Sequence, residues 1–424
     1  MMNAIIVLNF MISVLFTICY AYQFFYVFVG LKSRGKKYTH EKEHRYAVVV
    51  SARNESGVIG NLIGSIKNQN YPEELIDVYV IADNCTDNTA EVAKNAGAYV
   101  FERFNKVQVG KGYALDWFFK RLEDENKDKL YDAYIVFDAD NIVDTEFVRE
   151  MNKVFDNGYR IITSYRNSKN YGENWITAGY SLWFLREARY LNNARMQLGT
   201  SCAISGTGFL VSSEIIRENG GWIHHLLTED IEFTTDSIIH GEKIGYCADA
   251  VLYDEQPTTF KQSCRQRMRW AKGFYQVFGK YGKKLFCGML KGNFSCYDML
   301  MTLMPSMLLT LISISVNLIA IPFGMANHSS ELPMLLKTIF ETIMGFYAMF
   351  FVMGAITVTT EWKKIYCSNV RKVLFLFTFP VFMLTYIPIS LVALFCKVEW
   401  KPITHNVSKT LQEICCESTV VGNK

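Results

Sequence analysis

Residues 133–140 read AYIVFDAD and decide the fold that we expect. Five apolar residues with high β-propensity precede two carboxylates one residue apart, which predicts a buried strand that ends in an acidic turn. The segments 46–50 (YAVVV) and 78–82 (VYVIA) have the same design, because each ends in polar residues and leads into a helical pattern. Strands that alternate with helices are typical of an α/β domain with a mostly parallel sheet. The polar residues after the strands should therefore meet at one edge of that sheet, where such sheets bind their ligands.

Asp138 and Asp140, the two carboxylates of this stretch, are the predicted metal ligands. A sugar nucleotide carries a diphosphate, and Mg²⁺ or Mn²⁺ can bridge it to protein oxygen atoms directly or through water. Asp and Asn after a strand are also good turn and capping residues, so any one polar cluster has a purely structural explanation. Three such clusters at one edge favour a binding site for a nucleotide and a cofactor, Mg²⁺ or Mn²⁺.

Two motifs further along the chain add candidate residues. Residues 206–208 (Gly-Thr-Gly) allow a ligand to approach the backbone closely. Residues 228–230 (Thr-Glu-Asp) place adjacent carboxylates before a helical stretch, and Asp230 is our candidate for the base that deprotonates an attacking hydroxyl. Thr228 could equally cap that helix while the two acids complement its dipole, and capping does not exclude catalysis.

Gln266, Arg269 and Trp270 lie at i, i+3 and i+4 of a helical pattern and so share one face. An arginine can clamp a phosphate, and a tryptophan offers a flat stacking surface to a sugar or a base. The same stretch could instead lie along a membrane, with its other basic residues, Arg267 included, meeting lipid headgroups. Both interpretations can hold for opposite faces of one helix.

The flanks of the chain are apolar, in contrast to its charged middle. Residues 3–31 contain no charged side chain, which exceeds both the roughly 20 residues needed to cross a bilayer and the apolar part of a signal peptide. We therefore expect a transmembrane anchor at 1–31. Four basic residues follow at once, and the positive-inside rule then puts the middle region in the cytoplasm.

Three further apolar runs, at 299–325, 341–361 and 372–397, bring the minimum number of membrane spans to four. The loop 327–333 has no Lys or Arg and should be external, whereas basic residues between 363 and 372 favour the inside. Four simple crossings would leave a lysine-containing tail outside, against the same rule. Pro380 and Pro388 could break the last run into a re-entrant hairpin, which would remove the conflict.

The expected organisation is an α/β catalytic domain inserted between transmembrane α-helices. The boundaries that we predict are an anchor at 1–31, a cytoplasmic domain at 32–282, an interfacial segment at 283–298, a transmembrane region at 299–397 and a tail at 398–424. A formal charge of +3, with no basic run interleaved with aromatic residues, argues against a nucleic-acid partner. The eleven cysteines form no C-x-x-C pair, and their only close pair is Cys415 and Cys416, so we expect ordinary reduced thiols.

Taken in order, the motifs resemble the processive family 2 glycosyltransferases, the group of cellulose, hyaluronan, chitin and poly-N-acetylglucosamine synthases. The resemblance covers residues 46–273 and implies the GT-A fold, a Rossmann-like α/β domain. It also implies that Asp138 and Asp140 bind the metal and UDP. The donor, a UDP-sugar, would be bound by Ala52, Arg53, Asn54, Glu55, Asp83, Lys111 and Asp138.

The resemblance assigns the remaining motifs as well. The family's T-E-D motif carries the catalytic base and matches Thr228, Glu229 and Asp230. Its Q-x-x-R-W motif holds pyrophosphate and acceptor. With the glycine-rich loop, our predicted acceptor and pyrophosphate residues are Gly206, Thr207, Gly208, Gln266, Arg269 and Trp270.

The function implied by the resemblance is inverting transfer from UDP-glucose or UDP-N-acetylglucosamine. Such transfer would elongate a β-linked polysaccharide and be coupled to its export across the plasma membrane. The expected partners are the growing glycan or a lipid as acceptor, the membrane lipids, and either a second copy or an accessory export subunit. A second copy or a subunit is expected because only one clear helix precedes the catalytic domain. One copy would then leave the channel that translocates the glycan incomplete. The lack of a regulatory domain after the last span argues against control by a cyclic nucleotide.

Two other functions stay open at this point. One keeps the chemistry but adds a single sugar, or a few, to a membrane lipid. The other is a membrane protein that binds nucleotide without turning it over. A transporter would be favoured by charges inside the spans, but these are limited to Lys337 and Glu341 near one end. The sugar and the linkage depend on pocket residues that are distant in sequence, so several donors remain open.

Overall fold

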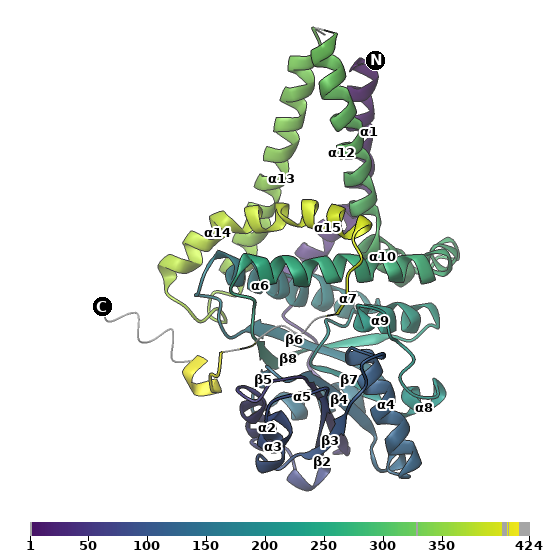
Figure 1. The fold of residues 1–424 in the computed structure, drawn as a ribbon, viewed down its shortest axis with the longest axis vertical. Coiled ribbons are helices and arrows are strands. Elements are labelled where there is room, and N and C mark those ends of the chain that lie inside the picture. The colour runs from purple at the N-terminus through teal and green to yellow at the C-terminus, as the bar shows by residue number, and fades with distance from the viewer. Residues whose placement is uncertain (1, 328–329, 401–404, 406, 415–424) are drawn as a thin grey trace.

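The computed structural model describes residues 2–327, 330–400, 405 and 407–414, and these form a sheet domain with long helices standing on one side of it (Figure 1). In the sequence, the sheet domain lies between the first helix and the last five helices. This arrangement confirms the predicted fold class, an α/β domain between apolar helices. Cys415, Cys416 and much of the predicted tail lie outside the described residues, and no disulfide links the cysteines within them.

The eight strands of the described chain form one sheet in the order β3-β2-β1-β4-β7-β6-β8-β5. Their bounds are β1 (Tyr46–Ala52), β2 (Ile76–Asp83), β3 (Tyr99–Arg103), β4 (Ala133–Asp138), β5 (Ile142–Val143), β6 (Ile161–Ser168), β7 (Phe209–Ser212) and β8 (Ile244–Asp254). The half made of β3, β2, β1 and β4 is parallel, as the sequence predicts. The other half is mixed, because β7 runs antiparallel to both β4 and β6, and β5 runs antiparallel to β8.

The register of the parallel half brings three predicted polar clusters to one level. Ala52 at the end of β1 pairs with Ala82, the neighbour of Asp83, and Ser51 pairs with Asp138. Nearly every residue of β1 is fully buried, and so is the apolar part of β4, which is why both read as unbroken apolar runs. The sequence therefore predicted correctly that these clusters share an edge.

Short helices pack against the sheet. They are α2 (Ile59–Lys67), α3 (Thr89–Asn95), α4 (Lys111–Asp124), α5 (Phe147–Asp156), α8 (Ser213–Glu218) and α9 (Glu229–Ile239), with 3-10 turns η1 (Glu73–Leu75) and η2 (Asp128–Leu130). In α5 the buried apolar residues are Phe147, Val148, Met151 and Val154, one face of a helix of 3.6 residues per turn. Each such side chain contributes about 1.5–3 kcal/mol when it leaves water.

A second layer of helices separates the sheet from the apolar helices. It contains α6 (Trp175–Arg186), the π-helical stretch η3 (Glu187–Asn192), α7 (Asn193–Leu198) and α10 (Phe260–Leu290). Ten of the twelve residues of α6 are buried, because α14 packs on one side of this helix and β6 on another. The helix α10 runs without a break across position 282, where we predicted a boundary between the catalytic domain and an interfacial segment. That division stays a prediction.

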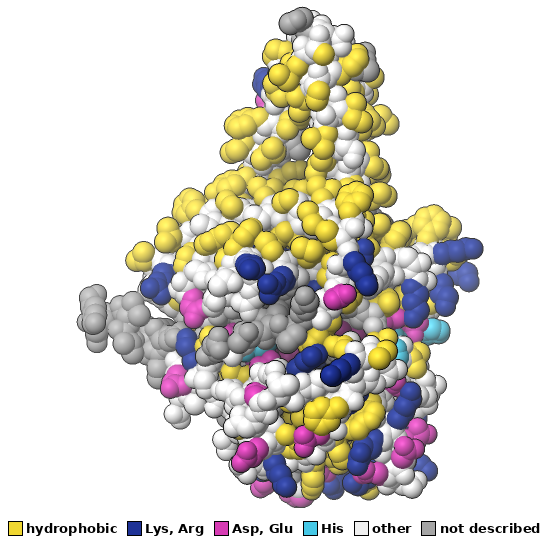
Figure 2. Space-filling model, in the orientation of Figure 1, with side chains coloured by type: hydrophobic (Ala, Val, Ile, Leu, Met, Phe, Trp, Pro, Cys, Tyr) yellow, Lys and Arg dark blue, Asp and Glu magenta, His cyan; other side chains and the backbone are white. Residues whose placement is uncertain are grey.

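Four helical segments are long and apolar enough to cross a membrane, as the sequence predicts. They comprise α1 (Met2–Lys32), α11 (Phe294–Leu303) with α12 (Pro305–Ala326), α13 (Leu332–Thr360), and α14 (Asn369–Leu384) with α15 (Tyr386–Phe395). In Figure 1 α1, α12 and α13 stand upright, whereas α14 and α15 lie across their base. Figure 2 shows that apolar side chains cover the upright helices and the upper side of the crosswise pair.

A buried ion pair ties α1 and α11 to the sheet domain. Arg195 of α7 donates to both carboxylate oxygens of Asp298 in α11, at 2.7 and 2.9 Å. The hydroxyls of Tyr22 and Tyr26 in α1 donate to the same carboxylate, each at 2.8 Å. Breaking a buried pair of this kind costs about 3–5 kcal/mol, because it leaves one charge uncompensated. The first and the eleventh helix are therefore fixed to the domain at one point.

Candidate active site

The loop after β1 is held in shape by the loop after β2. Asn54 adopts a left-handed backbone with φ of 57°, and its side-chain oxygen accepts a hydrogen bond from the Thr86 amide at 2.8 Å. The Glu55 amide donates to the Thr89 hydroxyl at 2.8 Å. Ala52 is buried at the end of β1, and the guanidinium of Arg53 projects from it. Hydrogen bonds thus fix the predicted nucleotide loop against the segment that follows β2.

Asp83 lies at the same edge but is committed to an ion pair. Its carboxylate accepts from Arg103 at 2.5 Å, and both side chains are almost fully buried. Arg103 also donates to the Gln108 carbonyl at 2.9 Å, which fixes the loop that leads into α4. Sequence reasoning missed Arg103, because an arginine at the end of a strand has no distinguishing pattern. The pair orders the entrance to the predicted nucleotide site.

Lys111 joins two predicted motifs. Its ammonium group donates to Asp138 at 2.6 Å and to the Gly206 carbonyl at 2.7 Å. Next to it Gly112 has no room for a side chain, since a β-carbon there would come within 2.3 Å of the His224 carbonyl. The N-terminus of α4 therefore lies directly against the acidic turn and the glycine-rich loop.

Thr207 and Gly208 connect that loop to β4. The Thr207 hydroxyl accepts from the Asp138 amide at 2.9 Å, and the Gly208 amide donates to the Val136 carbonyl at 2.8 Å. Gly208 has φ of 64°, and a β-carbon there would lie 1.9 Å from Leu252. Only glycine fits this conformation and this space. The predicted role of the motif, close backbone approach, is consistent with its position beside Asp138.

Asp140 is deeply placed among other carboxylates. Only 3% of it is exposed, and its side chain accepts from the Glu255 amide at 3.2 Å. Its neighbour Asp254 is held by Arg166 and by the amide groups of Asn141 and Gln256. Burial raises the pKa of Asp254 to about 6, with Asp140 adding to the effect and Arg166 opposing it. The edge of the sheet thus concentrates negative charge around the predicted metal ligands.

This donor set suits a hard divalent cation that shares a nucleotide's phosphates. Within the described part of the chain no three His, Cys, Asp or Glu side chains form a ready-made metal cluster. Asp138 and Asp140 nevertheless present carboxylate oxygens one residue apart, the ligand type that Mg²⁺ and Mn²⁺ prefer. Two protein cations, Lys111 and His405, lie against these two carboxylates. The carboxylates therefore already attract positive charge to the position where the metal is predicted.

Glu229 and Asp230 begin α9 as a half-buried pair. A β-carbon on Gly206 would lie 3.5 Å from the Asp230 carboxylate, so the predicted base faces the glycine-rich loop. Burial raises the pKa of Asp230, and the charges of Arg269 and Lys111 oppose this rise. Burial also raises the pKa of Glu229, with the charge of Asp230 adding to it. Both carboxylates therefore lie in a low-dielectric environment next to two cations.

The Thr228 side chain does not cap α9. No side-chain capping bond forms at this position, and the Thr228 hydroxyl has no hydrogen-bond partner among the described residues. Gly273 of α10 packs on this threonine so closely that a β-carbon would come within 2.4 Å of the hydroxyl. The alternative prediction, that the Thr228 side chain caps this helix, is therefore wrong.

The helix α10 carries the predicted acceptor and pyrophosphate residues over this pair. Arg269 donates to the Leu227 carbonyl at 2.8 Å and so holds the segment before α9. Trp270 packs edge-on against Tyr180 and Phe184 of α6, at 5.7 and 6.2 Å between ring centres. Gln266 is half-buried, and its side-chain oxygen has no hydrogen-bond partner within the described residues.

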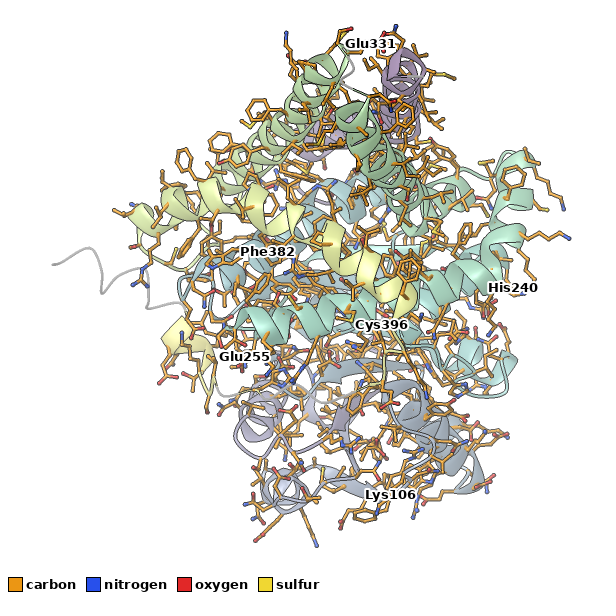
Figure 3. All side chains as sticks on the ribbon, turned by 45° about the horizontal axis from the view of Figure 1, so that its top comes forward. Lys106, His240, Glu255, Glu331, Phe382 and Cys396 are labelled. Atoms are coloured by element: carbon orange, nitrogen blue, oxygen red, sulfur yellow. The ribbon has the colours of Figure 1, made fainter. Side chains whose placement is uncertain are left out.

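Arg267, three residues before Trp270 in α10, does not meet lipid headgroups. It is 1% exposed and donates to the Phe382 carbonyl at 3.1 Å and to the Thr385 hydroxyl at 2.8 Å. Its guanidinium also lies 4.4 Å from the ring centre of Phe382. Figure 3 labels Phe382 on α14, part of the crosswise pair that lies over α10. The lipid-contact explanation is wrong for this residue, which fixes the break between α14 and α15 instead.

The segment after α15 returns to the sheet edge, which the sequence did not predict. The His405 ring is 2.9 Å from Glu55 and 3.8 Å from Asp140. Trp400 stacks on Arg53 at 5.3 Å, and the Val407 amide donates to Glu255 at 3.0 Å. Burial works against the charge of His405, but the carboxylates of Asp140, Glu55 and Glu255 outweigh it and raise its pKa to about 10. Contacts across more than 150 residues leave no signal in the local sequence.

Comparisons with known proteins agree with this geometry. A family model described as "Glycosyltransferase like family 2" matches residues 44–273, just over half of the chain. A β-monoglucosyldiacylglycerol synthase of Synechocystis sp. is 26% identical over 55% of this chain and 48% of its own length. A poly-β-1,6-N-acetyl-D-glucosamine synthase of Staphylococcus epidermidis is 22% identical over 60% of this chain and 61% of its own. The chain thus spans between about half and three fifths of these curated relatives.

A solved structure shares the fold over nearly the whole chain. It is a mannosyltransferase from Pyrobaculum calidifontis, determined in complex with GDP-Man and Mn²⁺. The alignment covers 91% of this chain and 98% of that one, with a TM-score of 0.56 and 14% sequence identity. The likeness therefore extends beyond the sheet domain to the apolar helices.

Proposed function

The chain belongs to glycosyltransferase family 2 and is a glycosyltransferase, and from this premise we propose that it transfers sugar from a UDP-sugar with inversion at a membrane face. The observation that carries the proposal is the convergence of Lys111, Asp138, Gly206 and Asp230 at one sheet edge. These residues come from four separate segments. Their meeting supports a pocket that holds a diphosphate on one side and an acceptor hydroxyl on the other.

Asp230 is the base of the proposed reaction. Its carboxylate takes the proton of the acceptor hydroxyl as that oxygen bonds to the anomeric carbon, and the bond from the anomeric carbon to UDP breaks. Attack opposite an α-linked leaving group gives a β-linkage. Thr228 and Glu229 position this carboxylate at the start of α9. Arg269 and Trp270 border the acceptor side, together with Gln266.

The donor is bound at the edge of the parallel half. The residues that we assign to it are Ala52, Arg53, Asn54, Glu55, Asp83, Lys111 and Asp138. Asp138 and Asp140 would hold Mg²⁺ or Mn²⁺, which neutralises the charge that develops on the departing diphosphate. Lys111 adds a second positive charge, and the 206–208 loop lets the diphosphate approach the backbone closely.

The proposed product is a β-linked polysaccharide, with UDP-glucose or UDP-N-acetylglucosamine as donor and the growing glycan as acceptor. A glycolipid is the second candidate, supported by the orientation of α14 and α15. These helices lie across the base of the upright ones, so in a single copy only α1, α12 and α13 stand upright. Export of a polymer would then need a second copy or an accessory subunit, whereas a lipid acceptor would not.

We assign the catalytic domain to the cytoplasmic side of the plasma membrane. The segment 369–395 leaves the catalytic domain and returns to it, because Arg371 donates to the Gly172 carbonyl at 2.8 Å and His405 contacts Glu55. A re-entrant or interfacial position for this segment keeps its lysine-containing tail inside, as the positive-inside rule requires. Three crossings, by α1, α12 and α13, place both the basic residues after α1 and the lysines of the tail on the cytoplasmic side.

The test is product analysis with the purified, full-length protein in lipid vesicles. Labelled UDP-glucose and UDP-N-acetylglucosamine are supplied with Mn²⁺, and the products are separated by size and by extraction into organic solvent. Long glycan sensitive to β-specific glycosidases supports the polysaccharide, and a one-sugar lipid supports the glycolipid. No release of UDP from either donor would reject the proposed use of UDP-sugars.

A further inference from the structure

The turn between α10 and α11 carries exposed apolar side chains at the base of the upright helices. Phe286 and Leu290 lie one turn apart on α10, and 49% of the first and 70% of the second is exposed. Phe294, the first residue of α11, is exposed as well. In Figure 1 this end of α10 projects sideways past the upright helices. Large apolar side chains that gather on a surface mark a site of contact with a partner.

Three exposed lysines, Lys283, Lys284 and Lys291, border this apolar surface. Lys284 and Lys291 are seven residues apart and so share one face of the helix, and Lys283 adds a third positive charge beside them. Within the described residues none of the three ammonium groups lies within 4.0 Å of a carboxylate, whereas Lys280 pairs with Glu232 at 2.7 Å. Figure 2 shows basic side chains gathered below a hydrophobic patch on this side of the molecule. The three charges are therefore available to an anionic partner.

The turn is fixed next to the apolar helices. Phe294 packs edge-on against Tyr22 of α1, at 5.8 Å between ring centres, and Tyr297 donates to the Cys19 carbonyl at 2.9 Å. The helix α11 leads directly into α12, and the two form one candidate membrane span. Aromatic side chains at the end of a span are typical of the level where hydrocarbon meets headgroups. The contacts with α1 therefore hold the end of α10 at the membrane face.

A lipid surface fits both the apolar and the basic part of this turn. A helix that lies in a membrane interface buries its apolar side chains between the acyl chains and keeps its lysines at the headgroups. The long stem of a lysine lets its ammonium group reach a lipid phosphate from such a position. A neutral partner would cover Phe286 and Leu290 but leave the lysines without counter-charge. The surface is also continuous with the apolar helices that a bilayer covers.

We propose that the end of α10 is a docking surface for anionic phospholipids, in which Phe286 and Leu290 enter the interface while Lys284 and Lys291 bind the phosphate groups. The same helix carries predicted acceptor residues in its first half, so this contact orients the candidate site toward the membrane. The inference concerns lipid binding and does not depend on which sugar is transferred or on the product. Its failure and that of the proposed function are therefore separate results.

The test measures which lipid contacts this turn in the full-length protein. The protein is placed in phosphatidylcholine nanodiscs with equal traces of photoactivatable phosphatidylglycerol or phosphatidylcholine, and adducts on residues 283–294 are counted by mass spectrometry. The anionic probe should label this segment at least about tenfold more than the zwitterionic probe. Each lysine near a membrane surface contributes about fivefold in affinity. Lys284→Gln combined with Lys291→Gln should therefore lower the preference to about twofold or less.

Lys67→Gln combined with Lys94→Gln is the matched control. These exposed lysines belong to α2 and α3, which Figure 1 shows far from the upright helices. The control removes the same amount of charge and should keep the wild-type preference. Phe286→Ser combined with Leu290→Ser should instead reduce labelling by both probes, because the turn then enters the interface less deeply.

A free phosphate is the other anion that these lysines could bind. Inorganic phosphate should reduce labelling by phosphatidylglycerol no more than chloride does at equal ionic strength, since it has no acyl chains to bring it to the apolar surface. Competition by phosphate beyond that of chloride would show a site for soluble anions and overturn the inference. Equal labelling by the two lipid probes in the wild type, or an unchanged preference in the lysine variant, would overturn it as well.

Discussion

The charged side chains at the edge of the sheet and Arg267 in the helical cover, formed by α10, α14 and α15, have different kinds of partner. At the edge, carboxylates are matched by protein cations, as Asp138 is by Lys111 and Asp83 is by Arg103. In the helical cover, Arg267 lies among aromatic rings and bonds only to neutral oxygens. A cation at the edge can be supplemented or replaced when a metal and a nucleotide bind. The cover cannot change its partners in this way without moving α14 and α15.

This difference predicts that substitutions at the edge change catalysis and nucleotide binding, while substitutions in the cover change stability. The edge residues lie among polar and charged groups, so a conservative change there removes a chemical group and leaves the packing intact. The cover residues are buried between helices that are far apart in sequence. A change there alters how the layers fit together.

The largest effect should come from Asp230→Asn. The amide cannot take a proton from the acceptor, so transfer should fall by about 10²- to 10⁴-fold, while affinity for UDP changes by less than about twofold. Initial rates with labelled donor and calorimetric titration of UDP measure the two quantities. Asp249→Asn, an exposed aspartate of β8, is the matched control. Transfer at the wild-type rate in Asp230→Asn would remove this residue from the reaction.

Asp140→Asn should have the next largest effect. Loss of a carboxylate ligand should weaken binding of UDP in the presence of Mn²⁺ by at least about tenfold, because the diphosphate loses part of its counter-charge. Chelation of divalent cations should abolish transfer by the wild-type protein, and added Mn²⁺ should restore it. Full activity in excess chelator would show that the site works without a metal.

The arrangement at the sheet edge could be predicted because it depends on residues that lie close together in the sequence. Three strands of the parallel half, β1, β2 and β4, are short apolar runs, and candidate site residues follow each of them directly, as Asp138 follows 133–137. Parallel pairing with Ser51 opposite Asp138 then brings the clusters together without further information. The mixed half was not anticipated, because β7 is only four residues long and follows a glycine-rich loop.

The cover could not be predicted in the same way, since its contacts join distant segments. Arg267 meets Phe382 and Thr385 across more than 100 residues, and His405 meets Glu55 across 350. Nothing near Arg267 in the sequence distinguishes a buried arginine from one that meets lipid headgroups. The position of α14 and α15 had one local signal, the prolines at 380 and 388, which allowed a re-entrant hairpin but did not require it.

Arg267→Met tests the cover directly. Methionine fills a similar volume but leaves the Phe382 carbonyl and the Thr385 hydroxyl without their donor, so stability should fall by about 1–3 kcal/mol. The measurement is the apparent melting temperature of the detergent-solubilised protein, with UDP affinity expected to stay within about twofold. Arg265→Met, an exposed position on the same helix, should leave the melting temperature unchanged. A larger loss of UDP affinity than of stability would contradict the division between edge and cover.

The smallest effect concerns pH and joins the two regions, because Arg269 of the cover faces Asp230 of the edge. Burial raises the pKa of Asp230, and the charge of Arg269 opposes this rise. The base acts only when deprotonated, so activity is lost as pH falls through this pKa. Arg269→Gln removes the opposing charge, and the acid limb of the kcat profile should therefore move to higher pH, by up to about one unit. Profiles of kcat measured between pH 4.5 and 8 at constant ionic strength determine the shift. The control is Lys283→Gln, because Lys283 is an exposed residue further along α10. A limb that stays in place or moves to lower pH would show that the cover does not tune the base.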